Sequence, residues 1–130
     1  MSTAPPSAAP RPLMILVAGP YRSGTGDDPA KLAANVAAMH AVALPLFQRG
    51  HLPVTGEDLA LPLATLAGST RTGDAPFTAV FHPYAERLLA RCDAVLRVGG
   101  PSAGADAMVD LARRAGKAVY QDLDQIPAAA

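Results

Sequence analysis

The chain has 130 residues, of which 50% are hydrophobic and 17% charged, and its formal net charge is zero. This length fits one domain, and the composition supports a buried core and argues against disorder. Without a basic excess the chain lacks the electrostatic field that nucleic-acid binding normally needs, so the expected partner is a small molecule. Cys92 is the only cysteine, which excludes an internal disulfide and a cysteine-built zinc site and fits a reducing cytoplasm.

The composition of the two ends predicts tails on either side of one domain. Residues 1–12 are rich in Pro, Ala and Ser and are predicted to be a flexible tail, and residues 127–130 are predicted to fray. The apolar run at 13–17 is short and leads into a Gly/Pro turn, so it predicts a buried strand rather than a signal peptide. We expect no membrane-spanning segment, which would need about 20 apolar residues.

Between the tails, apolar runs alternate with helical patterns. In chain order we predict strands over 13–18, 51–54, 93–98 and 118–121, with helices over 29–48, 57–66, 78–91 and 103–115 and a loop over 67–76. Pro45 is expected to kink the first helix or end it early. Alternation of this kind predicts an α/β fold with a parallel sheet covered on both faces, which binds ligands at the carboxyl ends of its strands.

The loop after the first strand has the chemistry of such a site. It matches neither the P-loop nor the dinucleotide-binding pattern of spaced glycines, which argues against an ATPase or a dehydrogenase. Tyr21 can stack on a base or donate its hydroxyl, and Arg22 and Ser23 can hold an oxyanion. The alternative is a plain turn that carries a surface Tyr and a surface Arg.

A second loop, over 99–106, connects the third strand to a helix, and we expect it to line the same pocket. Gly100 and Gly104 let a ligand approach the backbone, and the free N–H groups of the helix N-terminus point at it. Ser102 is either the helix N-cap or a ligand for a sugar hydroxyl or phosphate.

The helix after this second loop presents two different faces. Asp106 and Asp110 share one face, and Asp106 is kept as a candidate ligand-binding residue. Met108 lies about 200° around the helix from each aspartate, on the face of Gly104, so it is predicted to point into the pocket or under it.

Other side chains have both a structural and a functional interpretation. Glu57 follows the second strand and is either a helix first-turn acid or a site carboxylate. Asp93 is either a turn residue at strand entry or a carboxylate that orients another group. The histidines at 40, 51 and 82 lack metal-ligand spacing and are interpreted as structural, and we expect no metal and no cofactor.

Two segments in this order resemble the nucleoside 2-deoxyribosyltransferase-like superfamily, and in particular its small uncharacterised bacterial branch. They are Ala18-Gly19-Pro20-Tyr21 and Asp93-Ala94-Val95, the latter continuing to Ser102-Ala103-Gly104-Ala105. The resemblance covers roughly residues 13–126. It implies a flavodoxin-like three-layer sandwich with a five-stranded parallel sheet, and a homo-oligomer, a dimer or larger, whose pockets can borrow a residue from a neighbour.

The resemblance also implies cleavage of the N-glycosidic bond of a nucleoside or its monophosphate, by attack of a Glu on the anomeric carbon. Carried over by position, Gly19, Pro20 and Tyr21 lie by the sugar and base. Asp93 is the acid-side carboxylate, and Ser102 contacts the sugar or its phosphate. The position of the nucleophile is held by Met108, whose thioether cannot act as a carboxylate.

Because Met108 cannot act as the family's nucleophile, three outcomes are open. The chain is an N-glycosidase that uses another carboxylate, Glu57 first and Asp106 next, or a nucleoside-binding module without catalysis, or a protein with different chemistry in the same pocket.

Overall fold

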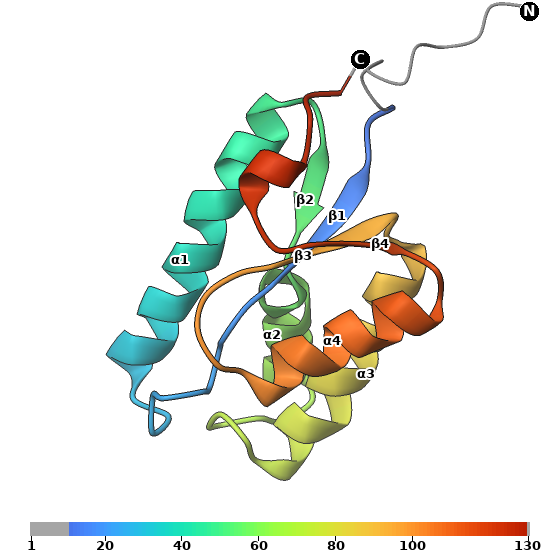
Figure 1. The fold of residues 1–130 in the computed structure, drawn as a ribbon. Coiled ribbons are helices and arrows are strands. Elements are labelled where there is room, and N and C mark those ends of the chain that lie inside the picture. The colour runs from blue at the N-terminus through green and yellow to red at the C-terminus, as the bar shows by residue number, and fades with distance from the viewer. Residues whose placement is uncertain (1–10, 130) are drawn as a thin grey trace, which may run out of the picture.

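The computed structural model describes residues 11–129 and shows a parallel sheet with helices on both faces (Figure 1). The sheet has four strands in the order β2-β1-β3-β4, and all three strand pairs are parallel. The strands are β1 (Met14–Ala18), β2 (Leu52–Val54), β3 (Ala94–Arg97) and β4 (Ala118–Tyr120).

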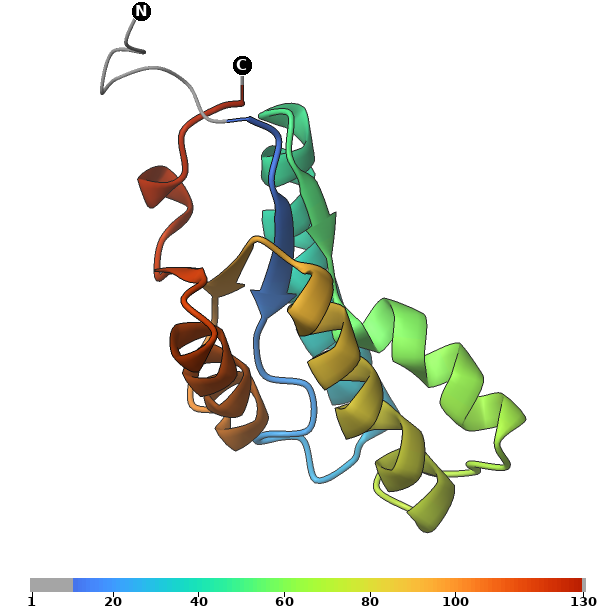
Figure 2. The ribbon, with the colours of Figure 1, turned by 90° about the vertical axis from the view of Figure 1, so that its right-hand side faces the viewer.

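The helices are distributed unevenly around this sheet. They are α1 (Pro29–Gln48), α2 (Gly56–Leu66), α3 (Ala75–Arg91) and α4 (Ala103–Arg114), with a short 3-10 turn η1 (Leu123–Gln125). Helix α1 covers one face, and α3 and α4 cover the other, whereas α2 stands beyond the β2 edge beside α3 (Figure 2). The sheet therefore has its two helical layers, with α2 as an outlying element.

The core consists of two apolar layers, one on each face of the sheet. Alternation along β1 sends Ile15 and Val17 toward α1, where they pack with Met39 and Leu46. Leu16 and Ala18 point the other way, into the layer that α3 and α4 complete. This is why the strand is apolar at every position: each face of a parallel sheet is covered.

The α/β fold with a parallel sheet is confirmed, and it is consistent with a flavodoxin-like arrangement. The expected five-stranded sheet is wrong, since residues 11–129 form four strands. After β4 the chain turns into η1 and buries Ile126 in the α1-side layer, so this segment covers the sheet instead of extending it.

The helix boundaries correct two predictions. Of the two expected effects of Pro45, a kink or an early end of the first helix, the early end is wrong, because α1 continues to Gln48. The carbonyl that Pro45 leaves without an N–H partner belongs to Ala41, which is exposed and can be hydrated. Helix α3 starts at Ala75 rather than at 78, because Asp74 caps it and accepts a 3.0 Å hydrogen bond from the backbone N–H of Phe77.

The described parts of both ends are held to the domain. Residues 1–10, most of the predicted N-terminal tail, lie outside the described residues, as does Ala130. The carbonyl of Pro127 lies 2.8 Å from Nε2 of buried His51, and the N–H of Ala129 donates to the carbonyl of Arg49 at 2.7 Å. Residues 127–129 are therefore fixed against the α1–β2 connection, contrary to the predicted fraying.

Helix α1 is also long and apolar enough to cross a membrane by length and composition alone, which the sequence interpretation did not expect. Its 20 residues contain only Lys31 and His40 as ionisable side chains. Leu32, Met39 and Leu46 are buried on the domain, whereas the other residues of α1 are exposed or half-buried.

Candidate functional site

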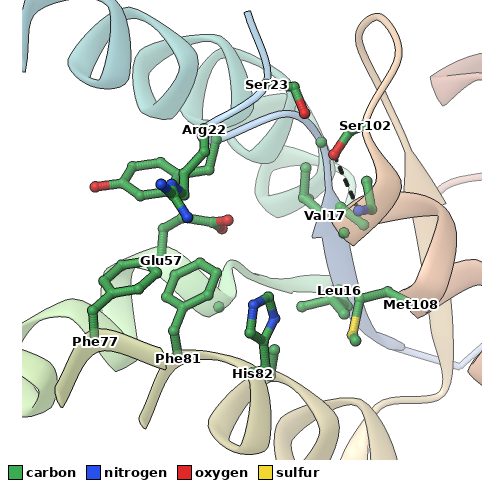
Figure 3. A pocket seen from close by; sticks show the side chains of 17 residues that line it. Leu16, Val17, Arg22, Ser23, Glu57, Phe77, Phe81, His82, Ser102 and Met108 are labelled. Atoms are coloured by element: carbon green, nitrogen blue, oxygen red, sulfur yellow. Dashed lines mark hydrogen bonds between the residues drawn. The ribbon is translucent and has the colours of Figure 1, made fainter. Parts of the chain in front are cut away.

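A cavity of about 190 Å³ lies at the carboxyl end of β1 (Figure 3). This is where the chain direction across the sheet reverses, since β1 connects to β2 on one side and pairs with β3 on the other. Its lining comes from β1 and the loop behind it and from α2, α3 and the start of α4: Leu16, Val17, Ala18, Gly19, Tyr21, Arg22, Ser23, Gly56, Glu57, Phe77, Phe81, His82, Ala85, Ser102, Gly104, Ala105 and Met108. The two loops singled out by sequence thus meet in one pocket.

Glu57 is the only carboxylate among the lining residues. It sits in the first turn of α2, where the hydroxyl of Thr55 caps the helix by accepting from the N–H of Asp58 at 3.2 Å. The residue is only 8% exposed. Burial raises the pKa of Glu57 from 4.5 to about 7; its backbone N–H opposes this rise, and the charge of Asp58 adds to it. A carboxyl group poised near neutrality in a cavity is typical of acid, base or nucleophile positions.

Three aromatic rings form one wall of the cavity. Phe77 and Phe81 are one helical turn apart on α3, and their rings stack at 4.7 Å with an interplanar angle of 15°. The ring of Tyr21 adds to them from the loop after β1, at 5.7 Å from Phe81. The rings are nearly parallel and stacked on one another, so they offer ring edges and the outer face of an end ring to a planar ligand.

The opposite side of the cavity is the N-terminus of α4. Ser102 is the N-cap, and its hydroxyl oxygen accepts from the N–H of Ala105 at 3.1 Å. That bond uses the oxygen as acceptor, so the hydroxyl proton stays available to a ligand. Ser23 brings a second hydroxyl from the first loop, and Figure 3 shows it on the same side of the pocket as Ser102.

Arg22 lies at the mouth of the cavity with its charge already paired. Its guanidinium makes two 2.9 Å hydrogen bonds to the carboxylate of Asp27. The same group lies 5.9 Å from the centre of the Phe77 ring, in cation–π geometry. Arg22 therefore closes the aromatic wall at one end, and an anionic ligand would have to compete with Asp27 for it.

Met108 both lines the cavity and packs in the core layer beneath it. It is 9% exposed, and Figure 3 shows it beside Leu16, across from Phe81 and His82. The side chain at the sequence position that the resemblance gives to the nucleophile is thus a thioether, which has no acid–base function.

Four of the sequence-predicted site residues do not line the cavity. Asp93 lies at the amino end of β3, where it accepts from the N–H of Met14 at 2.8 Å and pairs with Arg11 at 2.8 Å. The amino ends of parallel strands are at the edge opposite the ligand edge, so Asp93 is remote from the pocket.

The other three predicted site residues that do not line the cavity, Pro20, Gly100 and Asp106, lie where the two loops meet. Gly100 and Asp106 border a separate, open hollow with Arg97, whose Nε donates to Asp106 at 3.0 Å. Pro20 packs against Gly99: a Cβ on Gly99 would lie 2.7 Å from Cδ of Pro20, and the φ of 76° at Gly99 also favours glycine. These contacts hold the two loops together beside the cavity.

Sequence reasoning missed the contribution of α3. Phe77, Phe81 and His82 all line the cavity, although His82 was interpreted as structural. The available signal was the spacing of the two phenylalanines, which places them on one helix face with His82 next to them. His40 and His51 lie elsewhere: His40 pairs with Asp58 at 2.8 Å, and His51 bridges the chain ends.

Within residues 11–129, no three His, Cys, Asp or Glu side chains come together as metal ligands would. The cavity instead offers an aromatic surface, one buried carboxyl group, one imidazole, two serine hydroxyls and the hydroxyl of Tyr21. No protein-family model matches the chain, and no curated protein matches it at a significant level. The function of the cavity is therefore inferred from its chemistry.

Proposed function

We propose that the protein binds a nucleoside or nucleoside monophosphate in this cavity and cleaves its N-glycosidic bond, with Glu57 as the reacting carboxyl group. The observation that carries the proposal is Glu57 itself, a buried carboxyl with a pKa of about 7 beside a stacked aromatic wall. The two features suit the two halves of the substrate: the wall binds a planar base, and the carboxylate reacts at the sugar.

The base would lie against the rings of Tyr21 and Phe81. Stacking of a base on an aromatic side chain contributes about 1–3 kcal/mol and tolerates different bases. The sugar would then extend toward Ser102, whose hydroxyl proton is available to donate to a sugar hydroxyl or a phosphate oxygen.

In the reaction, the ionised Glu57 carboxylate attacks C1′ of the sugar. A carbon–oxygen bond forms as the carbon–nitrogen bond breaks, and the bonding electron pair leaves with the base. Water then hydrolyses the glycosyl ester, which releases the sugar and regenerates the carboxyl group; a second base in place of water gives transfer.

The departing base needs a proton, and His82 is the lining side chain best suited to supply it. It lies on α3 next to Phe81, and its ring stands edge-on to that phenylalanine at 5.6 Å. An imidazole N–H is a common proton donor in general acid catalysis, so His82 can protonate the base as it leaves. Glu57 and His82 would then have the separate roles of nucleophile and acid.

The second candidate function is a nucleoside-binding module without catalysis. The observation in its favour is that Met108 lines the cavity, because Met108 holds the sequence position that the resemblance gives to the nucleophile. This alternative keeps the same ligand, wall and hydroxyls, and differs only in the fate of the bound nucleoside.

Base release from a panel of nucleosides and their 5′-monophosphates, measured by liquid chromatography, tests the proposal. We expect free base from at least one compound, and loss of that activity in Glu57→Gln with ligand binding retained. The matched control is Asp58→Asn, which changes the adjacent carboxylate outside the lining. Binding without base release would establish the module instead, and Met108→Glu would then be expected to gain hydrolysis. No binding by any compound would overturn both functions.

A further inference from the structure

The cavity contains two features that commonly bind anions in proteins, an arginine at its mouth and a helix N-terminus. Arg22 is the only lysine or arginine among the lining residues. The start of α4, with Ser102 as its N-cap, presents backbone N–H groups and the positive end of the helix dipole. A 5′-phosphate on a bound nucleoside would be held by one of these features. The contacts that each already makes therefore bear on whether the cavity takes a charged or an uncharged ligand.

The carboxylate of Asp27 already occupies the guanidinium of Arg22. Its two oxygens accept from Nε and from one terminal nitrogen, each at 2.9 Å. Arginine binds a phosphate through the same two-point geometry. The hydrogen bonds from Arg22 lower the pKa of Asp27 below its ordinary 3.8, and Arg71 adds to this from outside the lining. Asp27 is therefore ionised at neutral pH, and its pair with Arg22 has no net charge.

The loop after β1 holds this pair in place. Within residues 11–129, Asp27 is the only non-glycine residue with a positive φ, which is 60°. Its N–H donates to the hydroxyl of buried Thr25 at 3.1 Å, and that hydroxyl donates to the carbonyl of Arg22 at 2.6 Å. The guanidinium also lies against Gly73, where a Cβ would be only 2.7 Å from Cζ. Arg22 is thus fixed by the loop that precedes α3 as well as by Asp27.

The donors that remain on the other side of the cavity are neutral. They are the hydroxyls of Ser23 and Ser102 and the first N–H groups of α4, whose dipole is already compensated by Asp106 in the first turn. Hydroxyl and amide donors suit the hydroxyls of a sugar. A phosphate carries about −1.5 to −2 charges at neutral pH, and the lining residues offer it no unpaired lysine or arginine.

Glu57 is a further reason against a phosphate in this cavity. In the proposed reaction its carboxylate attacks the sugar, so it must be ionised. Burial already opposes ionisation, and the charge of Asp58 adds to this. A dianion in the same cavity of about 190 Å³ would oppose it again, because like charges repel strongly where little water screens them. A bound monophosphate would thus suppress the nucleophile.

We propose that Asp27 is a specificity-determining residue, which keeps Arg22 from binding a phosphate so that the cavity takes uncharged nucleosides in preference to their 5′-monophosphates. The nucleoside part of this statement rests on the proposed function. The masking of Arg22 rests on the contacts of Asp27 alone, so it can be tested without a nucleoside.

Asp27→Asn tests the masking, because asparagine keeps the size of the side chain and accepts a positive φ but removes the charge. The matched control is Asp28→Asn, since Asp28 is the next residue and its side chain makes no capping hydrogen bond to α1. The probe is inorganic phosphate, and the readout is the melting temperature compared with chloride at equal ionic strength. We expect phosphate to stabilise Asp27→Asn, and neither the wild type nor Asp28→Asn. The double variant Arg22→Gln/Asp27→Asn should lose the effect.

The preference is measured by calorimetric titration of each nucleoside in the panel beside its own 5′-monophosphate. The wild type and Asp28→Asn should bind the nucleoside about tenfold more tightly, and Asp27→Asn should lose this ratio. The wild-type ratio also decides the proposal if Asp27→Asn does not fold. Neither measurement depends on base release, so a binding module without catalysis gives the same result.

Two outcomes would overturn the proposal. One is a wild type that binds monophosphates as tightly as nucleosides. The other is phosphate stabilisation that is equal in the wild type and Asp27→Asn, or absent from a folded Asp27→Asn. If no nucleoside binds but phosphate stabilises Asp27→Asn alone, the proposed function fails while the masking of Arg22 by Asp27 is supported.

Discussion

The ring of Tyr21 stacks on that of Phe81 at a centroid distance of 5.7 Å and an angle of 23°. This contact joins the loop after β1 to the middle of α3, two segments that are far apart in the chain. The wall of the cavity therefore exists only when α3 is docked, and the capping of α3 by Asp74 indirectly sets the position of the wall.

Phe81→Ala should weaken nucleoside binding about tenfold, because it removes the central ring of the stack, and stacking contributes about 1–3 kcal/mol per base. Calorimetric titration with the best compound of the panel measures this. The control is Tyr84→Ala, which removes a ring from the same helix outside the lining. Equal losses in the two variants would mean that the effect comes from α3 stability and not from stacking.

Glu57→Gln should change how stability depends on pH. The folded-state pKa of Glu57, about 7, lies above its ordinary 4.5, so the folded state holds the proton more tightly. Wild-type stability is then highest below about pH 4.5 and falls as the pH rises toward 7, since the buried carboxyl must ionise. The glutamine variant lacks this loss, and above pH 7 it should gain on the order of 3 kcal/mol at most.

Urea unfolding of the wild type and Glu57→Gln between pH 4 and 8 follows this difference directly. Glu86→Gln serves as the control here, because its carboxylate is exposed and does not contribute to the raised pKa of Glu57. Parallel pH profiles for the wild type and Glu57→Gln would contradict a raised pKa. The activity should show the opposite trend from stability and rise through pH 7 as the nucleophile ionises.

Met108→Glu should destabilise the fold by a few kcal/mol, because it places a carboxyl group against the core layer below the cavity. The loss should grow with pH as the new side chain ionises. Met108→Leu keeps the volume and should cost less than about 1.5 kcal/mol. Thermal melts at pH 4 and pH 8 separate the effect of charge from that of shape. A loss of stability that does not depend on pH would mean that the new carboxylate is exposed to solvent.

Asp93→Asn should lower stability and leave base release unchanged. The hydrogen bond from Arg11, together with that from the Met14 N–H, lowers the pKa of Asp93 from 3.8 to about 2. The ionised group thus stabilises the fold above pH 3.8, and this contribution is lost as the pH falls toward 2. Melting temperatures should differ at pH 7 and converge near pH 2. If Asp93→Asn instead lost base release while its ligand affinity was unchanged, Asp93 would have to take part in the reaction.

Arg97→Ala should cost more stability than Asp106→Ala. The Arg97 side chain is 10% exposed and also donates to the carbonyls of Val98 and Gly100, whereas Asp106 is 67% exposed. Removing the exposed carboxylate of Asp106 breaks an ion pair worth about 1 kcal/mol or less of folding free energy. Removing the guanidinium of Arg97 also leaves two carbonyls of the turn without a donor. Chemical unfolding measures both, and retention of base release in Asp106→Ala would leave Glu57 as the reacting carboxylate.

Much of the fold followed from local patterns. The apolar run of β1 and the alternation with helices predicted a parallel α/β sheet, because strands buried on both faces must be apolar throughout. The number of strands was predicted from the resemblance, and it failed where the chain after β4 folds into η1. Ser102 as N-cap of α4 was readable too, since capping depends on neighbouring residues only.

The sequence by itself determined the parallel sheet, the two glycine-containing loops and their position at one edge of it. Only the tertiary structure decided which side chains share the cavity: it brings in Phe77, Phe81 and His82 from α3, and it places Asp93 at the opposite edge. The physical reason is that propensity and capping act over a few residues, whereas burial depends on which elements pack together. The raised pKa of Glu57 arises from that packing.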